Sequence, residues 1–344
     1  MRDSRLTRRS FLRGAGRLAA GGAAAGWIAP VIAEPLSPTT TQPAERSFAA
    51  SQPANTTTRR SDGKSDVVQI RSDNVVRKGR MRPDVLHGML SDSLRQLTSA
   101  SDIAEAWHTI LQERDVIGIK FNRTGARELA TTPILARVLV ESLTEAGWDP
   151  KQIVLIEAPD ALRENLGTTA PSPYWSAPIV DFGSGKDQFA EVLEQITAII
   201  NVPFLKTHNI AGMTGCLKNL SHAMVRRPAR YHANRCSPYI ADIVAAEPIR
   251  SKLRLHLINA LFGVFDGGPE ATQNTIWPAQ TMIVSTDPVA ADTVGTEILN
   301  AERANRGLAA LDSDDDPIPA LYDAHRKGLG TTSWDEIRQS KLRA

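Results

Sequence analysis

Cysteine, aromatic residues and long apolar runs are all scarce in this 344-residue sequence. The only cysteines are Cys216 and Cys236, too few for a four-cysteine iron–sulfur cluster, and neither a CxxC nor an HxxxH pair of the zinc type occurs. Aromatic residues make up 5% of the chain, which favours an α/β protein over an aromatic-rich binding module. The apolar stretch near the N-terminus is interrupted by Arg17 and falls short of the roughly 20 apolar residues of a membrane-spanning helix.

An excess of charge of one sign is also missing. The chain has 40 basic and 38 acidic residues, but residues 1–33 hold six arginines and a single acid, Asp3. The remainder has 34 basic against 37 acidic residues, a net charge of about −3. Such a surface has no electrostatic footprint for nucleic acid, so we expect no nucleic-acid partner.

The N-terminus has the features of an export signal. Arg8 and Arg9 precede a Ser-Phe-Leu segment, an Ala/Gly-rich stretch follows, and the segment ends in a small-residue cleavage pattern at Ala33. Residues 1–33 therefore resemble a twin-arginine signal peptide, which implies export of a folded protein by the twin-arginine machinery to the periplasm or the extracellular space. This route also raises the prospect of a bound cofactor without naming one. An ordinary basic secretory signal or a short membrane anchor is the alternative.

The composition changes twice after this signal. Residues 34–64 are rich in Pro, Thr and Ser and predict a disordered linker. From residue 65, short apolar runs alternate with amphipathic stretches, which is typical of βα units. We expect one α/β domain over residues 65–344, with a mainly parallel, doubly wound sheet flanked by helices and no membrane span. The predicted strands are 67–70, 116–122, 152–158, 178–182, 198–202, 253–266 and 281–286, and Thr132-Pro133 and Asp287-Pro288 mark two helix starts.

Lys120 and Asn122 lie at the end of one predicted strand. Because they are two residues apart, strand alternation projects both side chains to the same face. In a doubly wound sheet the ligand crevice lies beyond the carboxyl ends of the strands. The pair therefore suits an anion or a carbonyl oxygen, and a solvated strand end is the alternative.

A second strand end carries many more titratable groups, in the stretch NVPFLKTHNIAGMTGCLKNLSH at 201–222. We predict a loop over 204–215 followed by a helix, whose N-terminal amides attract negative charge. Loop and helix together predict an anion site in which a histidine can also move a proton near neutral pH. The groups concerned are Lys206, His208, Lys218 and His222.

Metal binding and disulfide formation are alternative uses of this region. Residues of suitable type, though not at a compact zinc spacing, are His208, Cys216, His222, His232 and Cys236. An oxidising destination would permit a bond between the two cysteines. Asp266 ends a long apolar run before two glycines and is a candidate acid, base or metal ligand, whereas Asp287 more simply caps a helix.

Four segments carry a family resemblance: VIGIKFN, INVPFLKTHNIAGMTGCLKNL, VFDGGPEA and IVSTDPVAADTVGTEIL. Over about residues 110–310 the sequence resembles the family catalogued as domain of unknown function 362. The resemblance implies no established activity, and the clustered cysteines of a ferredoxin-like segment found in some members are absent here. The positions that match its motifs are Lys120, Asn122, Lys206, Thr207, His208, Lys218, Asn219, Asp266, Asp287 and Asp292.

Our leading hypothesis from the sequence is a basic strand-end pocket that binds an anionic or carboxylate-bearing small molecule. Its ligand-binding residues would be Lys120, Asn122, Lys206, Thr207, Lys218 and Asn219. If the protein is an enzyme, His208 and Asp266 would form an acid/base pair. One alternative is a metal- or redox-cofactor-binding protein, with His208, Cys216 and Asp266 as ligands, and another is a non-catalytic solute-binding or accessory protein.

Overall fold

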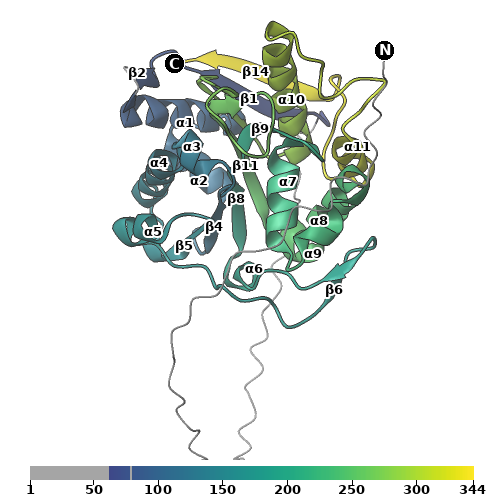
Figure 1. Cartoon of the computed structure of the whole chain (residues 1–344). Coiled ribbons are helices and arrows are strands. Elements are labelled where there is room, and N and C mark those ends of the chain that lie inside the picture. The colour runs from purple at the N-terminus through teal and green to yellow at the C-terminus, as the bar shows by residue number, and fades with distance from the viewer. Residues whose placement is uncertain (1–61, 78–79) are drawn as a thin grey trace, which may run out of the picture. The chain divides into compact units, whose positions relative to one another are not determined.

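The computed structural model describes residues 62–77 and 80–344. The predicted signal peptide and nearly all of the predicted linker lie outside these residues. The described part is a mixed α/β fold, in which helices cover both faces of a central, mostly parallel sheet (Figure 1). This architecture confirms the fold class predicted from the alternation of apolar runs and amphipathic stretches.

The main sheet contains ten strands within the described residues. Seven of them lie in the order β14 (Ile337–Arg343), β1 (Ser65–Arg71), β13 (Thr281–Ser285), β11 (Leu253–Val264), β8 (Ala198–Asn201), β4 (Ile117–Lys120) and β5 (Ile153–Ile156). The strands from β11 to β5 are parallel, as are β14 and β1, whereas β13 runs antiparallel to both of its neighbours. The other three are β9 (Phe204–His208), β10 (Gly212–Thr214) and β12 (Ile276–Trp277).

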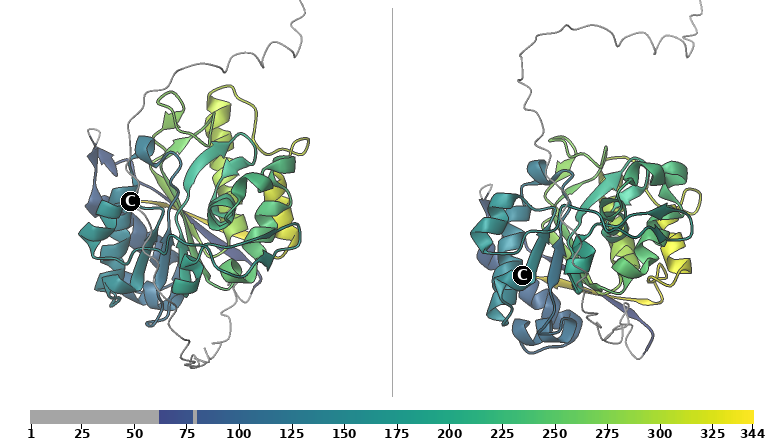
Figure 2. Two further views of the ribbon diagram at one scale, coloured as in Figure 1. Left: turned by 60° about the horizontal axis from the view of Figure 1, so that its bottom comes forward. Right: turned by 90° about the horizontal axis from the view of Figure 1, so that it is seen from below.

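Two hydrophobic cores lie on opposite faces of this sheet. Strand residues alternate between them, so that in β8 the side chain of Ile199 joins one core and that of Ile200 joins the other. One face is covered by α1 (Pro83–Thr98), α2 (Ile103–Ile110), α4 (Thr132–Glu145) and α5 (Asp160–Leu166). The other is covered by α6 (Val192–Gln195), α7 (Cys216–Ser221), α8 (Tyr239–Ala245), α9 (Glu247–Arg250), α10 (Pro288–Asn305) and α11 (Pro319–Arg326), and Figure 2 shows the two groups from below.

The two helix starts predicted from Pro are confirmed. Helix α10 begins after Asp287, whose carboxylate accepts hydrogen bonds from the backbone N–H groups of Val289 and Ala290, at 2.9 Å each. Helix α4 has a Pro in its first turn and is followed by Gly147 at φ 111°, a conformation that favours glycine. Both helices pack directly on the sheet.

Three parts of the fold differ from the prediction or were not predicted. Residues 204–214 form the β9–β10 hairpin and not a loop, and β9 pairs in parallel with β11. The run at 178–182 contributes β6 (Val180–Asp181), which pairs with β7 (Lys186–Asp187) outside the main sheet. Strand β14 was not predicted, because it is polar and only partly buried at the edge of the sheet.

The remaining short elements connect these parts. They are β2 (Val76–Arg77), β3 (Arg80–Met81), α3 (Ala126–Leu129) and the 3-10 turns Pro150–Gln152, His222–Met224, Pro228–Tyr231 and Ala233–Cys236. Within residues 62–77 and 80–344, we find no helix with the length and apolarity that crossing a bilayer requires.

Candidate functional site

The carboxyl ends of β4, β5 and β9 meet helix α7 around a cavity of about 300 Å³, which we call the basic pocket. This position agrees with the rule that ligands bind beyond the carboxyl ends of strands in such sheets. The pocket brings together seven of the sequence-based candidates, which are Asn122, Lys206, His208, Lys218, Asn219, His222 and His232. Its other polar lining residues are Thr124, Glu157, Thr214 and Glu270.

Lys120 lies behind the pocket and not in it. Its side chain is fully buried, and burial lowers the pKa of its ammonium. The Nζ atom donates to Glu157 Oε2 at 2.7 Å, to the Phe121 carbonyl at 2.5 Å and to Asn219 Oδ1 at 3.2 Å. An ammonium has three N–H groups, so none is left for a ligand. Lys120 therefore positions the pocket wall, and the predicted role in holding the anion is not supported by its geometry.

Asn219 is likewise committed to the protein. Its Oδ1 accepts from Lys120 and from Asn122 Nδ2 at 2.9 Å, and its Nδ2 donates to Asn201 Oδ1 at 2.8 Å. These bonds join α7 to β4 and β8. Asn122 differs from Asn219, because its Oδ1 is buried at the edge of the pocket and has no hydrogen-bond partner within residues 62–77 and 80–344.

Lys206 has one donor to spare. Its Nζ donates to the Thr124 carbonyl at 2.5 Å and to the Pro269 carbonyl at 2.9 Å, which leaves the third N–H without a partner among the described residues. Burial lowers the pKa of Lys206 to about 8, although the carboxylates of Glu270 and Glu157 oppose the shift. A partly desolvated ammonium of this kind binds an anion more strongly than a surface lysine.

Lys218 is the freest cation of the pocket. In the described part of the chain, its ammonium makes no ion pair or hydrogen bond, and burial lowers its pKa to about 8. Thr214, from β10, adds a buried hydroxyl that also has no hydrogen-bond partner. Both groups are therefore available to a ligand.

His208 enters the pocket as a neutral hydrogen-bond donor. Its Nδ1 lies 3.2 Å from the backbone nitrogens of both Ile210 and Ala211 and accepts from them, so the ring proton is on Nε2. Burial lowers the pKa of His208 to about 3, and the charges of Lys218, His232 and Lys206 act in the same direction. The sequence predicted a group that titrates near neutral pH, whereas the buried site holds the ring uncharged.

Thr207 faces away from the pocket. Strand alternation in β9 turns its side chain to the side opposite Lys206 and His208. Its Oγ1 accepts a hydrogen bond from Gly268 N at 3.0 Å. A Cβ at Gly268 would lie 1.9 Å from the Thr207 carbonyl oxygen, so only glycine permits this approach. Thr207 thus holds the 266–269 turn against β9 and does not line the pocket.

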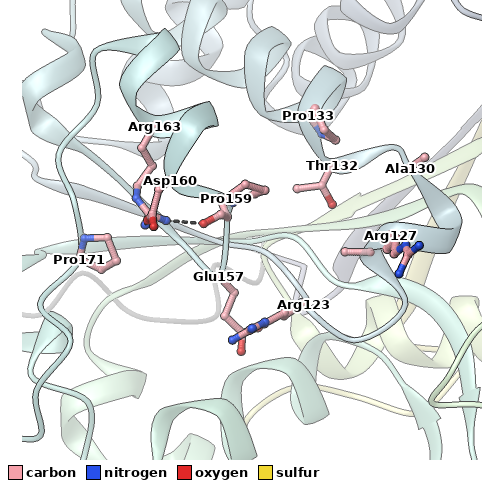
Figure 3. Close-up of a pocket in the computed structure, with 12 residues that line it drawn as sticks. Arg123, Arg127, Ala130, Thr132, Pro133, Glu157, Pro159, Asp160, Arg163 and Pro171 are labelled. Carbon is pink, nitrogen blue, oxygen red and sulfur yellow. Dashed lines mark hydrogen bonds and ion pairs between the residues drawn. The ribbon is translucent and has the colours of Figure 1, made fainter. Parts of the chain in front are cut away.

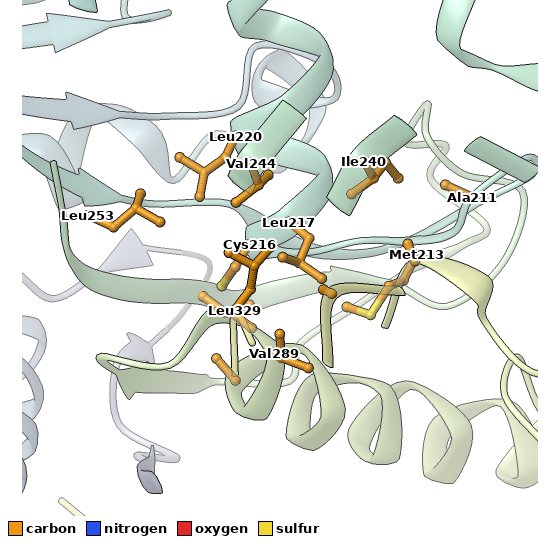
Figure 4. Packing of buried hydrophobic residues seen from close by; sticks show 14 of the residues in the cluster. Ala211, Met213, Cys216, Leu217, Leu220, Ile240, Val244, Leu253, Val289 and Leu329 are labelled. Carbon is orange, nitrogen blue, oxygen red and sulfur yellow. The ribbon is translucent and has the colours of Figure 1, made fainter. Parts of the chain in front are cut away.

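Asp266 and Cys216 also lie outside the pocket lining. The carboxylate of Asp266 is half-exposed and pairs with Arg303 Nη1 of α10 at 2.8 Å. Cys216 is packed among aliphatic side chains such as Leu217 and Leu253 (Figure 4), and burial raises the pKa of its thiol well above the usual value. The sequence-based pairing of Asp266 with His208 finds no geometric support. The same holds for the assignment of Asp266 and Cys216 as metal ligands.

The thiols of Cys216 and Cys236 are free. A disulfide between them was one of the alternatives left open by the sequence, and the structure does not contain it. Cys236 instead lies near His222 and His232, two residues that line the basic pocket.

Glu157 was missed by the sequence analysis. It follows β5 at a carboxyl strand end, adopts a left-handed backbone with φ 59°, and accepts from Lys120 and from Arg123 N at 3.1 Å. It also lines a second cavity of about 830 Å³, where Arg123 lies beside it (Figure 3). Its place near the end of the predicted strand 152–158 was the available signal.

The fold and the pocket together define an α/β protein with a cation-lined cavity at the carboxyl ends of its strands. Residues 117–297, just over half of the chain, match the family described as "Domain of unknown function (DUF362)", and the chain belongs to this family. This region runs from β4 into α10 and includes every residue of the basic pocket. None of the curated proteins matches the chain.

Proposed function

We propose that the basic pocket binds a small anionic molecule, such as one that bears a carboxylate. The observation that carries this proposal is the ammonium of Lys218, which has no partner among the described residues while it lines a cavity. A desolvated cation without a counter-ion is costly, and a bound anion would offset that cost. Lys206 supports the same ligand with its third N–H.

The acidic residues of the pocket do not cancel the positive charge of Lys206 and Lys218. Glu157 is neutralised by its contact with buried Lys120, at 2.7 Å. Glu270 is exposed at the mouth, where water screens its charge. The interior of the pocket therefore keeps a net attraction for an anion through Lys206 and Lys218.

Neutral polar groups would orient the ligand. The Nε2–H of His208 and the hydroxyl of Thr214 are donors for its oxygen atoms, and the unpartnered Oδ1 of Asn122 is an acceptor for a hydroxyl or amine. The 830 Å³ cavity on the other side of Glu157, with Arg123 and Arg127 on its rim, would take the body of a larger ligand. These features favour binding, because the groups that face the pocket can hold an anion and orient its oxygen atoms.

The proposal is tested with sulfate, which stays fully ionised over the useful pH range, and with a panel of small carboxylates in equilibrium dialysis. Lys218→Met is expected to weaken binding by about 10- to 100-fold, the value of one charge-assisted hydrogen bond. The matched control is Lys341→Met on exposed β14, which makes the same charge change away from the pocket. Equal affinities of Lys218→Met and the wild-type protein would remove the pocket as the binding site.

We further propose that the protein is exported through the twin-arginine route. The support is the sequence alone: the Arg8-Arg9 pair, the weakly apolar stretch and the small residues before Ala33. The anion site would then face the periplasm or the exterior of the cell.

A further inference from the structure

We propose that His222, His232 and Cys236 bind a divalent transition metal of the zinc class in the wall of the basic pocket. Their ligand atoms lie within 4.8 Å of one another, although the three residues come from three different 3-10 turns or their junctions. Nitrogen and thiolate ligands in a small cluster are those that Zn²⁺ and Co²⁺ prefer. This site does not depend on the anion proposal, because metal binding can be measured without the anion.

The backbone fixes the tautomer of each histidine so that one nitrogen remains free. His222 Nε2 lies 2.8 Å from the Tyr231 carbonyl oxygen, and His232 Nδ1 lies 3.1 Å from the Pro228 carbonyl oxygen. Carbonyl oxygens only accept, so these nitrogens carry the protons. The lone pairs are left on His222 Nδ1 and His232 Nε2. Metal-binding histidines are typically oriented by such a second hydrogen bond.

The hydroxyl of Ser221 lies near the free nitrogen of His222 and does not block it. Ser221 Oγ lies 3.0 Å from His222 Nδ1 and 3.2 Å from the Lys218 carbonyl oxygen. The hydroxyl has a single proton, and it can donate that proton to the carbonyl when a metal occupies Nδ1.

Cys236 is brought to the histidines by an unusual backbone. Asn234, Arg235 and Cys236 have φ values of 49°, 55° and 64°, a run of three non-glycine residues in the left-handed region. Such a run is strained and persists only where the surroundings hold it. Within the turn, Ser237 N donates to the Asn234 carbonyl at 2.9 Å, and at the surface Arg235 pairs with Asp316 at 2.5 Å. The strain is explained if the turn serves to present the thiol to the cluster.

Three protein ligands leave the fourth position of a tetrahedral metal open. Both His222 and His232 line the basic pocket, so the open position faces the same cavity as Lys218. Sites with three protein ligands and one open position bind water or an exogenous ligand. Metal binding converts the Cys236 thiol to a thiolate and releases its proton to solvent.

The test is a titration of the full chain with Co²⁺, followed by competition with Zn²⁺. We expect one Co²⁺ per chain and a thiolate-to-cobalt charge-transfer band. Cys236→Ser should remove the band, and Cys216→Ala, which alters the other buried cysteine, should retain it. His232→Gln is the second variant, because this ring is partly exposed and its replacement should disturb the fold less than that of buried His222. It should weaken Co²⁺ binding by at least about 100-fold, since loss of an outer-shell partner alone costs about 10- to 100-fold.

Two results would overturn the site: a wild-type protein that gives no thiolate band with Co²⁺, or a band that survives in Cys236→Ser. Lys218→Met separates this proposal from the anion proposal. Lys218 lies close enough to Cys236 for their charges to interact, so its removal should strengthen Co²⁺ binding by severalfold while it weakens sulfate binding. If Lys218→Met leaves sulfate binding unchanged, the anion proposal is wrong. If it leaves Co²⁺ binding unchanged, the metal proposal is wrong.

Discussion

Three lysines of similar appearance in the sequence have different tasks in the folded protein. Lys120 uses all three of its N–H groups within the protein, and Lys206 uses two. No described residue accepts a hydrogen bond from the ammonium of Lys218. The number of committed donors separates a structural cation from one that can hold a ligand. Sequence spacing contains no information on this number, because the accepting carbonyls come from distant parts of the chain.

Sulfate binding should weaken as the pH rises through about 8. Burial lowers the pKa of Lys206 from its ordinary value of 10.5 to about 8. The charge that attracts the anion is therefore lost around pH 8 and not above pH 10. Lys206→Met should bind sulfate about tenfold less tightly than the wild-type protein below pH 8 and should match it at higher pH. Equilibrium dialysis across this range, with circular dichroism as a check on folding, measures both.

A constant ratio between the two proteins at every pH would contradict this account. It would mean that Lys206 remains charged, or that it acts only through its bonds to Thr124 and Pro269. Lys218 titrates in the same window and faces the same cavity, so the variant keeps a reduced pH dependence of its own.

At the residue scale, the sequence predicted the members of the site better than their roles. Seven of the candidate residues line the pocket, and the alternation argument for Lys120 and Asn122 agrees with their shared contact to Asn219. The roles of His208 and Asp266 could not be predicted. The role of His208 depends on the backbone N–H groups of Ile210 and Ala211. The role of Asp266 depends on Arg303, which is 37 residues away.

At the element scale, helix α7 is held by a carboxylate from another helix. Asp292 of α10 accepts from the backbone N–H groups of Cys216 at 2.6 Å and Leu217 at 3.0 Å, in the first turn of α7. The backbone approaches so closely that a Cβ at Gly215 would lie 2.2 Å from Asp292 Oδ1. The same helix carries Lys218, so this contact positions the pocket wall.

Asp292→Ala should lower the free energy of unfolding by about 3 kcal/mol, because it leaves two buried N–H groups without acceptors. Denaturant unfolding measures the loss, and Asp292→Asn, which keeps one acceptor oxygen, should lose less. Burial raises the pKa of Asp292 from 3.8 to about 6. The folded state therefore holds this proton more tightly than the unfolded state.

The sign of the pH effect follows from this shift. The contribution of Asp292 is complete below pH 3.8 and decreases as the pH rises to about 6, so the cost of Asp292→Ala should be greatest in acid. A cost that instead grew above pH 6 would show that the carboxylate is stabilised by its hydrogen bonds more than it is destabilised by burial.

Elements with strong periodicity were predictable, and elements defined by distant partners were not. Central strands such as β8 and β13 are short apolar runs, and Pro288 marks the start of α10. Strand β9 contains Lys206 and His208, whose charge and polarity suggest a loop. It is a strand because it pairs with β11 and because backbone groups form hydrogen bonds with Lys206 Nζ and His208 Nδ1.

At the scale of the whole molecule, the N-terminal sequence predicts export. Replacement of Arg8 and Arg9 by Lys should retain the uncleaved precursor in the cytoplasm of a host with a twin-arginine system. Arg13→Lys, which makes the same change outside the pair, should leave export intact. Cell fractionation and N-terminal sequencing measure the outcome, and normal processing of the double variant would exclude this route.

The strand order has a consequence for the time at which the protein becomes complete. Strand β1, the first of the described part, lies between β13 and β14, which stand near the end of the chain. A ribosome synthesises β1 long before either of its partners, so β1 cannot join the sheet until β13 has been made. Its pairing with β14 comes later still, which makes this edge the last part of the described sheet that can form.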